Sequence, residues 1–238
     1  MVRWVRPAGV WWWVAQVALL AAVAALTGAL AAGSLLDLDV AVRNWIWDHR
    51  PPAVFNVATV LNYLGQGGWV LLPLATLLAA ALARRTRSVR PLLPVAGAFL
   101  VTGLTIGPMK LLLDRGFPGN DKLAHPERLF SDPIRGLAYP SGHAANAVVW
   151  YGVIALLVAG LFRAAGRELP AEAGWLIRVV PPLVVVCTTT LLTHHWLTDA
   201  VAGVLLGVFL DGLLRRVDWD AVPLPARLGP WRGSANLS

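Results

Sequence analysis

The stretch YPSGHAANAVVWYGVIALLVAGLF, residues 139–162, joins a short polar turn to a long apolar run. From residue 143 to residue 162 the run has the roughly 20 residues that one helix needs to cross the hydrocarbon layer of a membrane. Proline at position 140 and glycine at position 142 are typical of a turn directly before such a helix. The stretch therefore predicts a membrane-spanning helix that begins at a polar motif.

Five further runs of similar length and character lie along the chain. The six predicted spans cover approximately residues 11–33, 67–83, 91–113, 143–162, 176–194 and 196–214. Of the 238 residues, 57% are hydrophobic and only 14% are charged, which is too apolar for an ordinary soluble domain of this length. We therefore predict an all-α, polytopic membrane protein with a single domain over residues 1–222. Residues 223–238 are rich in proline, glycine and small polar residues, and are predicted to form a disordered cytoplasmic tail.

Arginines gather at alternate ends of the predicted spans. The clusters are Arg3 and Arg6; Arg84, Arg85, Arg87 and Arg90; Arg163, Arg167 and Arg178; and Arg215 and Arg216. Because arginine and lysine accumulate on the cytoplasmic side of a membrane, both termini are predicted to be cytoplasmic. Residues 34–66 and 114–142 are then extracytoplasmic. A cleavable signal peptide in the first run is an alternative, but its removal would leave an odd number of spans.

The formal charge of +7 is explained by these clusters, so we do not expect nucleic acid as a partner. Tryptophans crowd the predicted span ends, as in an interfacial aromatic belt; they are Trp11, Trp12, Trp13, Trp45, Trp47 and Trp196. The single cysteine, Cys187, lies in an apolar run and excludes an internal disulfide bond. The lipid bilayer is therefore the expected environment of the whole domain.

Residues 37–50 mix charged side chains with large apolar ones and predict an extracytoplasmic amphipathic helix that lies in the membrane interface. Pro51 and Pro52 are expected to end this helix. Glycines at positions 65, 67 and 68 indicate a turn before the second span.

A histidine and an aspartate stand four residues apart at the start of the last span. On a helix, Asp199 would share a face with His195, accept a hydrogen bond from one imidazole nitrogen and leave the other free as nucleophile or base. A pair at this spacing can also simply cap a helix, but ionisable residues close to a span are usually functional. His194 would point about 100° away on the helix and is interpreted as a structural or rim residue.

Two further pieces lie at ends of spans on the same predicted side. The turn with Ser141, Gly142 and His143 precedes a helix whose unpaired N–H groups favour an anion, although an ordinary Ser141 cap explains the same pattern. Lys110 and Arg115 lie near the outer end of the third span. These two cations either mark the interface or hold phosphate oxygens.

These pieces, in this order, resemble the type 2 phosphatidic acid phosphatase family over roughly residues 37–212. The Pro-Ser-Gly-His motif of the family is matched by residues 140–143, and its His-x-x-x-Asp motif by His195 and Asp199. Two arginines that are usual in the family fall at Phe117 and Thr189. Arg115 and the hydroxyls of residues 188–190 are the nearest substitutes.

The resemblance implies an integral lipid phosphatase of the cell membrane, with its site on the extracytoplasmic side. It implies that His195 attacks phosphorus, that Asp199 orients His195 and that His143 protonates the leaving group. The non-bridging oxygens would be held by Lys110, Arg115, Ser141 and Gly142. No metal or other cofactor is expected, since cationic side chains and a helix end supply the electrostatic stabilisation.

The substrate implied by the resemblance is a membrane lipid phosphate such as a polyprenyl diphosphate, phosphatidic acid or phosphatidylglycerol phosphate. Because the two usual arginines are absent, a non-catalytic homologue that binds or translocates lipid phosphates is an alternative. A vanadate haloperoxidase shares this kind of site, but six predicted spans argue against an enzyme of that generally soluble group.

Overall fold

A computed structural model describes residues 9–120, 122–130 and 136–224 of the chain. The predicted Arg3 and Arg6 cluster and the tail from residue 225 lie outside the described residues. The fold is all-helical, and six helices of the described part are long and apolar enough to cross a membrane. They are α1 (Val10–Ala31), the continuous helix of η2 (Gly67–Leu71) and α4 (Leu72–Thr86), α5 (Leu92–Leu113), α6 (Gly142–Ala164), α7 (Ala171–Leu191) and α8 (Leu197–Leu214).

All six predicted spans are confirmed as helices, and the main difference lies in the fifth. The predicted span ran to residue 194, whereas α7 ends at Leu191 and a turn over residues 192–196 leads into α8. Thr193 has a φ of 55° in this turn, which takes the chain out of the helix. His194 and His195 are therefore turn residues and not helical ones.

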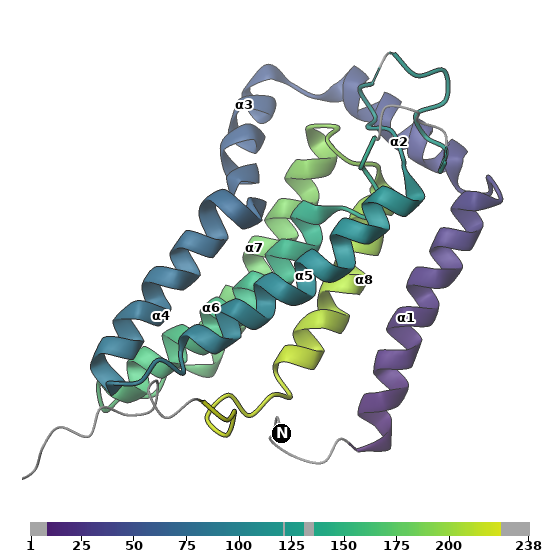
Figure 1. Cartoon of the computed structure of the whole chain (residues 1–238). Coiled ribbons are helices and arrows are strands. Elements are labelled where there is room, and N and C mark those ends of the chain that lie inside the picture. The colour runs from purple at the N-terminus through teal and green to yellow at the C-terminus, as the bar shows by residue number, and fades with distance from the viewer. Residues whose placement is uncertain (1–8, 121, 131–135, 225–238) are drawn as a thin grey trace, which may run out of the picture.

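Three shorter helices connect α1 to the second span. α2 (Leu36–His49) confirms the helix predicted over residues 37–50, and Arg50 and Pro51 follow it in extended conformation. α3 (Pro52–Leu61), which was not predicted, begins at a proline whose fixed φ suits the first turn of a helix. η1 (Asn62–Gly65) and η2 occupy the predicted glycine turn. Figure 1 shows α2, α3 and the long connection between α5 and α6 at the same end of the bundle.

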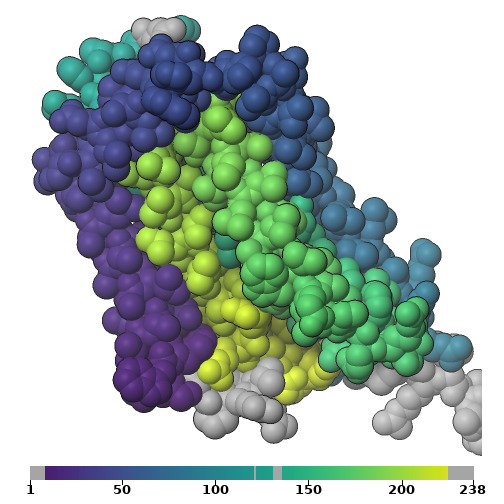
Figure 2. All heavy atoms as spheres, turned by 180° about the vertical axis from the view of Figure 1, so that it is seen from behind, coloured from purple at the N-terminus to yellow at the C-terminus, as the bar shows by residue number. Residues whose placement is uncertain are grey.

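The centre of the bundle is α6, which packs against α4, α5, α7 and α8. In the most apolar windows, 56% of α6 and 61% of α8 are buried, against 17% of α1. Figure 2 shows α8 between α1 and α7 on one face of the molecule. α1 therefore contacts the bundle mainly through α8 and leaves most of its apolar surface for lipid.

The tryptophans divide into two groups. Trp11 and Trp45 are 80% and 61% exposed, which suits the predicted aromatic belt. Trp196 is only 1% exposed and its indole nitrogen donates to the carbonyl of Gly116 at 2.8 Å, so its assignment to the belt was wrong. It holds the start of α8 against the connection between α5 and α6.

Two glycines of α8 allow it to approach α6 closely at the predicted site. A Cβ atom on Gly203 would lie 2.5 Å from the carbonyl oxygen of Ser141, and one on Gly207 would lie 2.8 Å from Cβ of Val148. The backbone N–H of Ser141 also donates to the carbonyl of Asp199 at 2.9 Å. The missing side chains thus bring the two histidine motifs side by side.

Candidate active site

The structure brings His143 and His195 together at the end of the bundle that is predicted to be extracytoplasmic. His143 lies in the first turn of α6, His195 lies in the turn before α8, and their ring centroids are 5.7 Å apart. Both side chains line a cavity of about 540 Å³. The other described residues of its wall are Phe117, Gly119, Asn120, Leu192, Thr193 and His194.

His195 and Asp199 are paired by a turn at a helix start, and not by a shared helix face as the spacing predicted. Nδ1 of His195 lies 3.6 Å from Oδ2 of Asp199, and this oxygen also accepts the backbone N–H of Trp196 at 2.9 Å. Asp199 thus caps α8 and faces the imidazole as well. The 3.6 Å separation exceeds a hydrogen bond, as is common in catalytic sites without substrate.

The environment of His195 favours its neutral form. The side chain is only 4% exposed, and burial lowers the pKa of His195 below its ordinary value, although the neighbouring Asp199 opposes this shift. A neutral imidazole with Nδ1 directed at a carboxylate leaves Nε2 as the nitrogen that is available to attack phosphorus. Burial thus favours the neutral imidazole, which is the form that the predicted nucleophile needs.

Two amide side chains that were not predicted as site residues contact the histidines. Nε2 of Gln66 lies 3.1 Å from Nε2 of His143, and Nδ2 of Asn62 lies 3.4 Å from Nδ1 of His194. Burial, followed by the nearby Arg50 cation, lowers the pKa of His194. The sequence signal for Gln66 is its position among the turn glycines 65, 67 and 68, and this position by itself indicates only a turn residue.

Ser141, Gly142 and Lys110 meet at the N-terminus of α6. Ser141 caps the helix by accepting the N–H of Ala144 at 3.3 Å. A Cβ atom on Gly142 would lie 3.3 Å from Cε of Lys110, so the lysine stem crosses the helix start. The ammonium group of Lys110 donates to the carbonyls of Leu137 and Ala138. A cation thus stands beside N–H groups that have no partner within their own helix.

Arg115 occupies a different place from the one expected of a phosphate ligand. Its side chain has no exposed surface, and it lies between two carboxylates, with Nη1 2.5 Å from Oδ1 of Asp199 and Nη2 2.6 Å from Oδ2 of Asp39. Nε donates to the carbonyl of Glu127 at 2.8 Å. The expected direct contact between Arg115 and phosphate is therefore not supported, since a buried guanidinium needs these partners.

Comparisons with known proteins agree with this architecture. A sequence model of the PAP2 superfamily matches residues 91–223, which is more than half of the chain. The chain belongs to the PAP2 superfamily. A search of curated proteins gave no match.

Among solved structures, this PAP2 chain is similar to one described as the first transmembrane PAP2 type phosphatidylglycerolphosphate phosphatase, from Bacillus subtilis. The two chains are 25% identical, with a TM-score of 0.68. The match covers 84% of this chain and 94% of the other. It extends well beyond the residues matched by the family model, and so supports the membrane-spanning PAP2 fold over most of the chain.

Phe117 and Thr189, which stand where PAP2 motifs usually have arginines, lie in different surroundings. Phe117 lines the histidine cavity, with its ring centroid 5.9 Å from that of His195. Thr189 is fully buried, and its hydroxyl has no hydrogen bond among the described residues. Thr188 donates its hydroxyl to Asn62 at 3.2 Å. No lysine or arginine is found among the described residues that line this cavity, so its electrostatics depend on cations set slightly further away.

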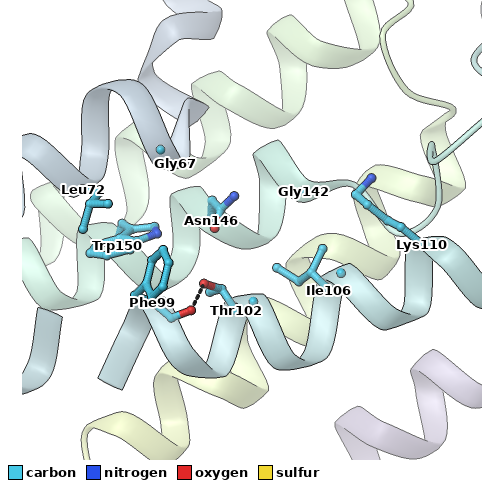
Figure 3. A pocket seen from close by; sticks show the side chains of 12 residues that line it. Gly67, Leu72, Phe99, Thr102, Ile106, Lys110, Gly142, Asn146 and Trp150 are labelled. Atoms are coloured by element: carbon cyan, nitrogen blue, oxygen red, sulfur yellow. Dashed lines mark hydrogen bonds between the residues drawn. The ribbon is translucent and has the colours of Figure 1, made fainter. Parts of the chain in front are cut away.

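A second cavity, of about 270 Å³, lies between the start of the second span, α5 and α6. Figure 3 shows Lys110 and Gly142 near one end, with Leu72, Phe99 and Trp150 toward the other. Phe99 and Lys110 are eleven positions apart on α5, a rise of about 16 Å along the helix. The cavity is therefore an elongated apolar groove that ends at the proposed phosphate-binding cation.

Proposed function

We propose that this protein is a lipid phosphatase that hydrolyses a phosphate ester or diphosphate headgroup through a phosphohistidine intermediate, on the extracytoplasmic side of the cell membrane. The observation that carries the proposal is the meeting of His143 and His195 at one cavity, with Asp199 behind His195. His143 and His195 lie at the starts of α6 and α8, so the site is at one end of these spans, where a lipid headgroup would be found.

The reaction takes two displacements at phosphorus. Nε2 of His195 forms a bond to phosphorus as the bond to the lipid oxygen breaks, and His143 gives its proton to the departing oxygen. His143 then takes a proton from water, which attacks phosphorus and releases His195 with inorganic phosphate. Asp199 stabilises the positive charge that His195 carries between the two steps.

Negative charge on the non-bridging oxygens would be met by Lys110, the Ser141 hydroxyl and the N–H groups of Gly142 and His143. Lys110 already lies against Gly142, so it needs only a change of partner from the carbonyls of Leu137 and Ala138. Charge-assisted hydrogen bonds contribute roughly 1.5–3 kcal/mol each, so one lysine and a helix end replace part of the usual arginine cradle. These groups require no metal.

The relative from Bacillus subtilis is named for phosphatidylglycerol phosphate, and we propose the same substrate first for this chain. The apolar groove beside Lys110 supports a lipid, because a hydrocarbon chain would lie along α5 and α6 while the phosphate reaches the histidines. Phosphatidic acid and a polyprenyl diphosphate are the other two candidate substrates.

The test is release of inorganic phosphate from these three lipids by the purified full chain in detergent. We expect release from at least one lipid, and a phosphorylated histidine when the reaction is stopped under alkaline conditions that preserve phosphohistidine. Tight binding of all three lipids without release of phosphate would instead favour a non-catalytic homologue. The absence of the usual arginines at Phe117 and Thr189 is the observation in favour of that alternative.

The groove gives a prediction on lipid length. Gly103 lines the groove, and nothing lies within 4 Å of where its Cβ would be, so Gly103→Leu would add apolar volume to the groove from a position with room for the Cβ atom. We expect KM for a long-chain lipid phosphate to rise about 10-fold, while KM for a short-chain, water-soluble analogue changes less than about 2-fold. The matched control is Gly28→Leu, on α1, where nothing lies within 4 Å either. Equal shifts for both chain lengths would argue against a hydrocarbon chain in this groove.

A further inference from the structure

We propose that Asp39, on the amphipathic helix α2, is a positioning residue of the reaction that acts on His195 through Arg115 and Asp199. The inference rests on the proposed phosphohistidine function and adds a residue that the PAP2 motifs of this chain do not contain. α2 thereby becomes part of the catalytic apparatus, in addition to any role at the membrane interface.

The geometry is a continuous chain of buried polar contacts. Oδ2 of Asp39 lies 2.6 Å from Nη2 of Arg115, and Nη1 of Arg115 lies 2.5 Å from Oδ1 of Asp199. The other oxygen of Asp199 faces Nδ1 of His195. The side chains of Asp39, Arg115 and Asp199 have no exposed surface, so water does not screen them.

Asp39 also holds the first turn of α8. Its Oδ1 accepts the backbone N–H of Thr198 at 3.0 Å, and its Oδ2 accepts the Thr198 hydroxyl at 2.5 Å. The same hydroxyl accepts a hydrogen bond from Nη1 of Arg115 at 2.8 Å. Asp39 thus fixes the guanidinium and the helix start that carries Asp199, and so fixes the carboxylate in front of the imidazole.

The charges explain why a carboxylate is needed at this position. Two carboxylates and one guanidinium give a buried net charge of −1, and this charge is neutralised when His195 becomes positive on bonding to phosphorus. Without Asp39, Arg115 and Asp199 would form a neutral pair and favour the charged ring less. Among the described residues, Lys110 of α5 and His143 of α6 also face His195, and Arg43 of α2 lines a small cavity beside it. None of these three supplies negative charge.

The experiment compares Asp39→Asn with Asp37→Asn, an exposed carboxylate on the same helix. Asparagine keeps an acceptor for Thr198 but removes the charge. With saturating lipid phosphate in excess over enzyme, we expect the rate constant for formation of the phosphohistidine in the first turnover to fall about 10–100-fold for Asp39→Asn and less than about 2-fold for Asp37→Asn. KM is expected to change less than about 3-fold. A partly unfolded sample would lower the amplitude instead, so the rate constant separates positioning from folding.

Arg115→Lys provides a second route if Asp39→Asn does not fold. Lysine keeps the positive charge but lacks the fork that bridges two carboxylates, so the same rate constant should fall about 10-fold or more. Where both single variants fold, the Asp39→Asn, Arg115→Lys double variant should have a rate constant within about 2-fold of that of the slower single variant. The two losses should not multiply, because both residues act on His195 through the same contacts.

Thr198→Val separates positioning from simple anchoring of α2. This change removes the hydroxyl link and keeps all three charges, and we expect a loss of less than about 5-fold. Three outcomes would overturn the positioning role alone. The first is an Asp39→Asn rate constant equal to that of Asp37→Asn, and the second is a loss in Thr198→Val as large as that in Asp39→Asn. The third is a double variant in which the losses of Asp39→Asn and Arg115→Lys multiply. A wild-type protein that releases no phosphate from any lipid would overturn the proposed function and this role together.

Discussion

His195→Ala is expected to lower phosphate release from the lipid substrate by about 10⁴-fold or more, because the variant lacks the nitrogen that forms the bond to phosphorus. The side chain is almost fully buried at the wall of the cavity, with Nδ1 directed to Asp199. The phosphorylated histidine of the wild-type protein should also disappear. The measurement is inorganic phosphate release and trapping of the intermediate in the same detergent preparation.

His194→Ala is the matched control for this prediction. His194 is the preceding residue, lines the same cavity and contacts Asn62, but it does not face Asp199. We expect its removal to lower release by less than about 10-fold, since it takes no part in bond formation. A large loss of phosphate release in His194→Ala, together with a phosphohistidine that still forms in His195→Ala, would show that His194 and not His195 is the nucleophile.

His143→Ala is expected to lower release by about 10²–10⁴-fold for a lipid phosphate, whose alkoxide leaving group needs a proton. The loss in the first step should shrink to less than about 10-fold for an aryl phosphate, because a phenolate leaves without protonation. The measurement is the rate at which His195 becomes phosphorylated, followed by rapid quenching with both substrates.

The second step provides an internal check on His143. Water must still lose a proton to cleave the phosphohistidine, so the intermediate should accumulate in His143→Ala when an aryl phosphate is the substrate. An equal loss of phosphorylation rate for lipid and aryl phosphates would show that His143 is not the acid. In that case the contact with Gln66 would point to a structural role.

The spans could be predicted because their signal is local. A run of about 20 apolar residues has the length to cross the hydrocarbon layer whatever its neighbours are, and α6 and α8 lie close to the predicted limits. The end of α7 was missed, because the apolar run continues through Leu191 and Leu192 while the left-handed Thr193 turns the chain. α3 was missed because it has only ten residues, which are too few for a span, and includes the polar Asn56 and Thr59, so it resembles a connection.

The partners of the polar residues could not be predicted in the same way. Arg115 was expected to bind phosphate because it follows Lys110 along the chain, but its direction is set by Asp39, which is 76 residues away. Asp39 was included only in the polar face of an amphipathic helix. Gln66 meets His143 only because the glycines around it let the loop pack against α6, where a Cβ on Gly67 would lie 2.7 Å from Nδ2 of Asn146.

By itself, the sequence determined the helical class, the six spans and the presence of His143, His195 and Asp199, because hydrophobic length and short motifs are properties of neighbouring residues. Only the tertiary structure decided that Arg115 lies behind the site between two carboxylates, that α2 contributes Asp39, and that a groove leads to Lys110. A buried charge needs an opposite charge at hydrogen-bonding distance, and the packing of distant helices determines which residue supplies it.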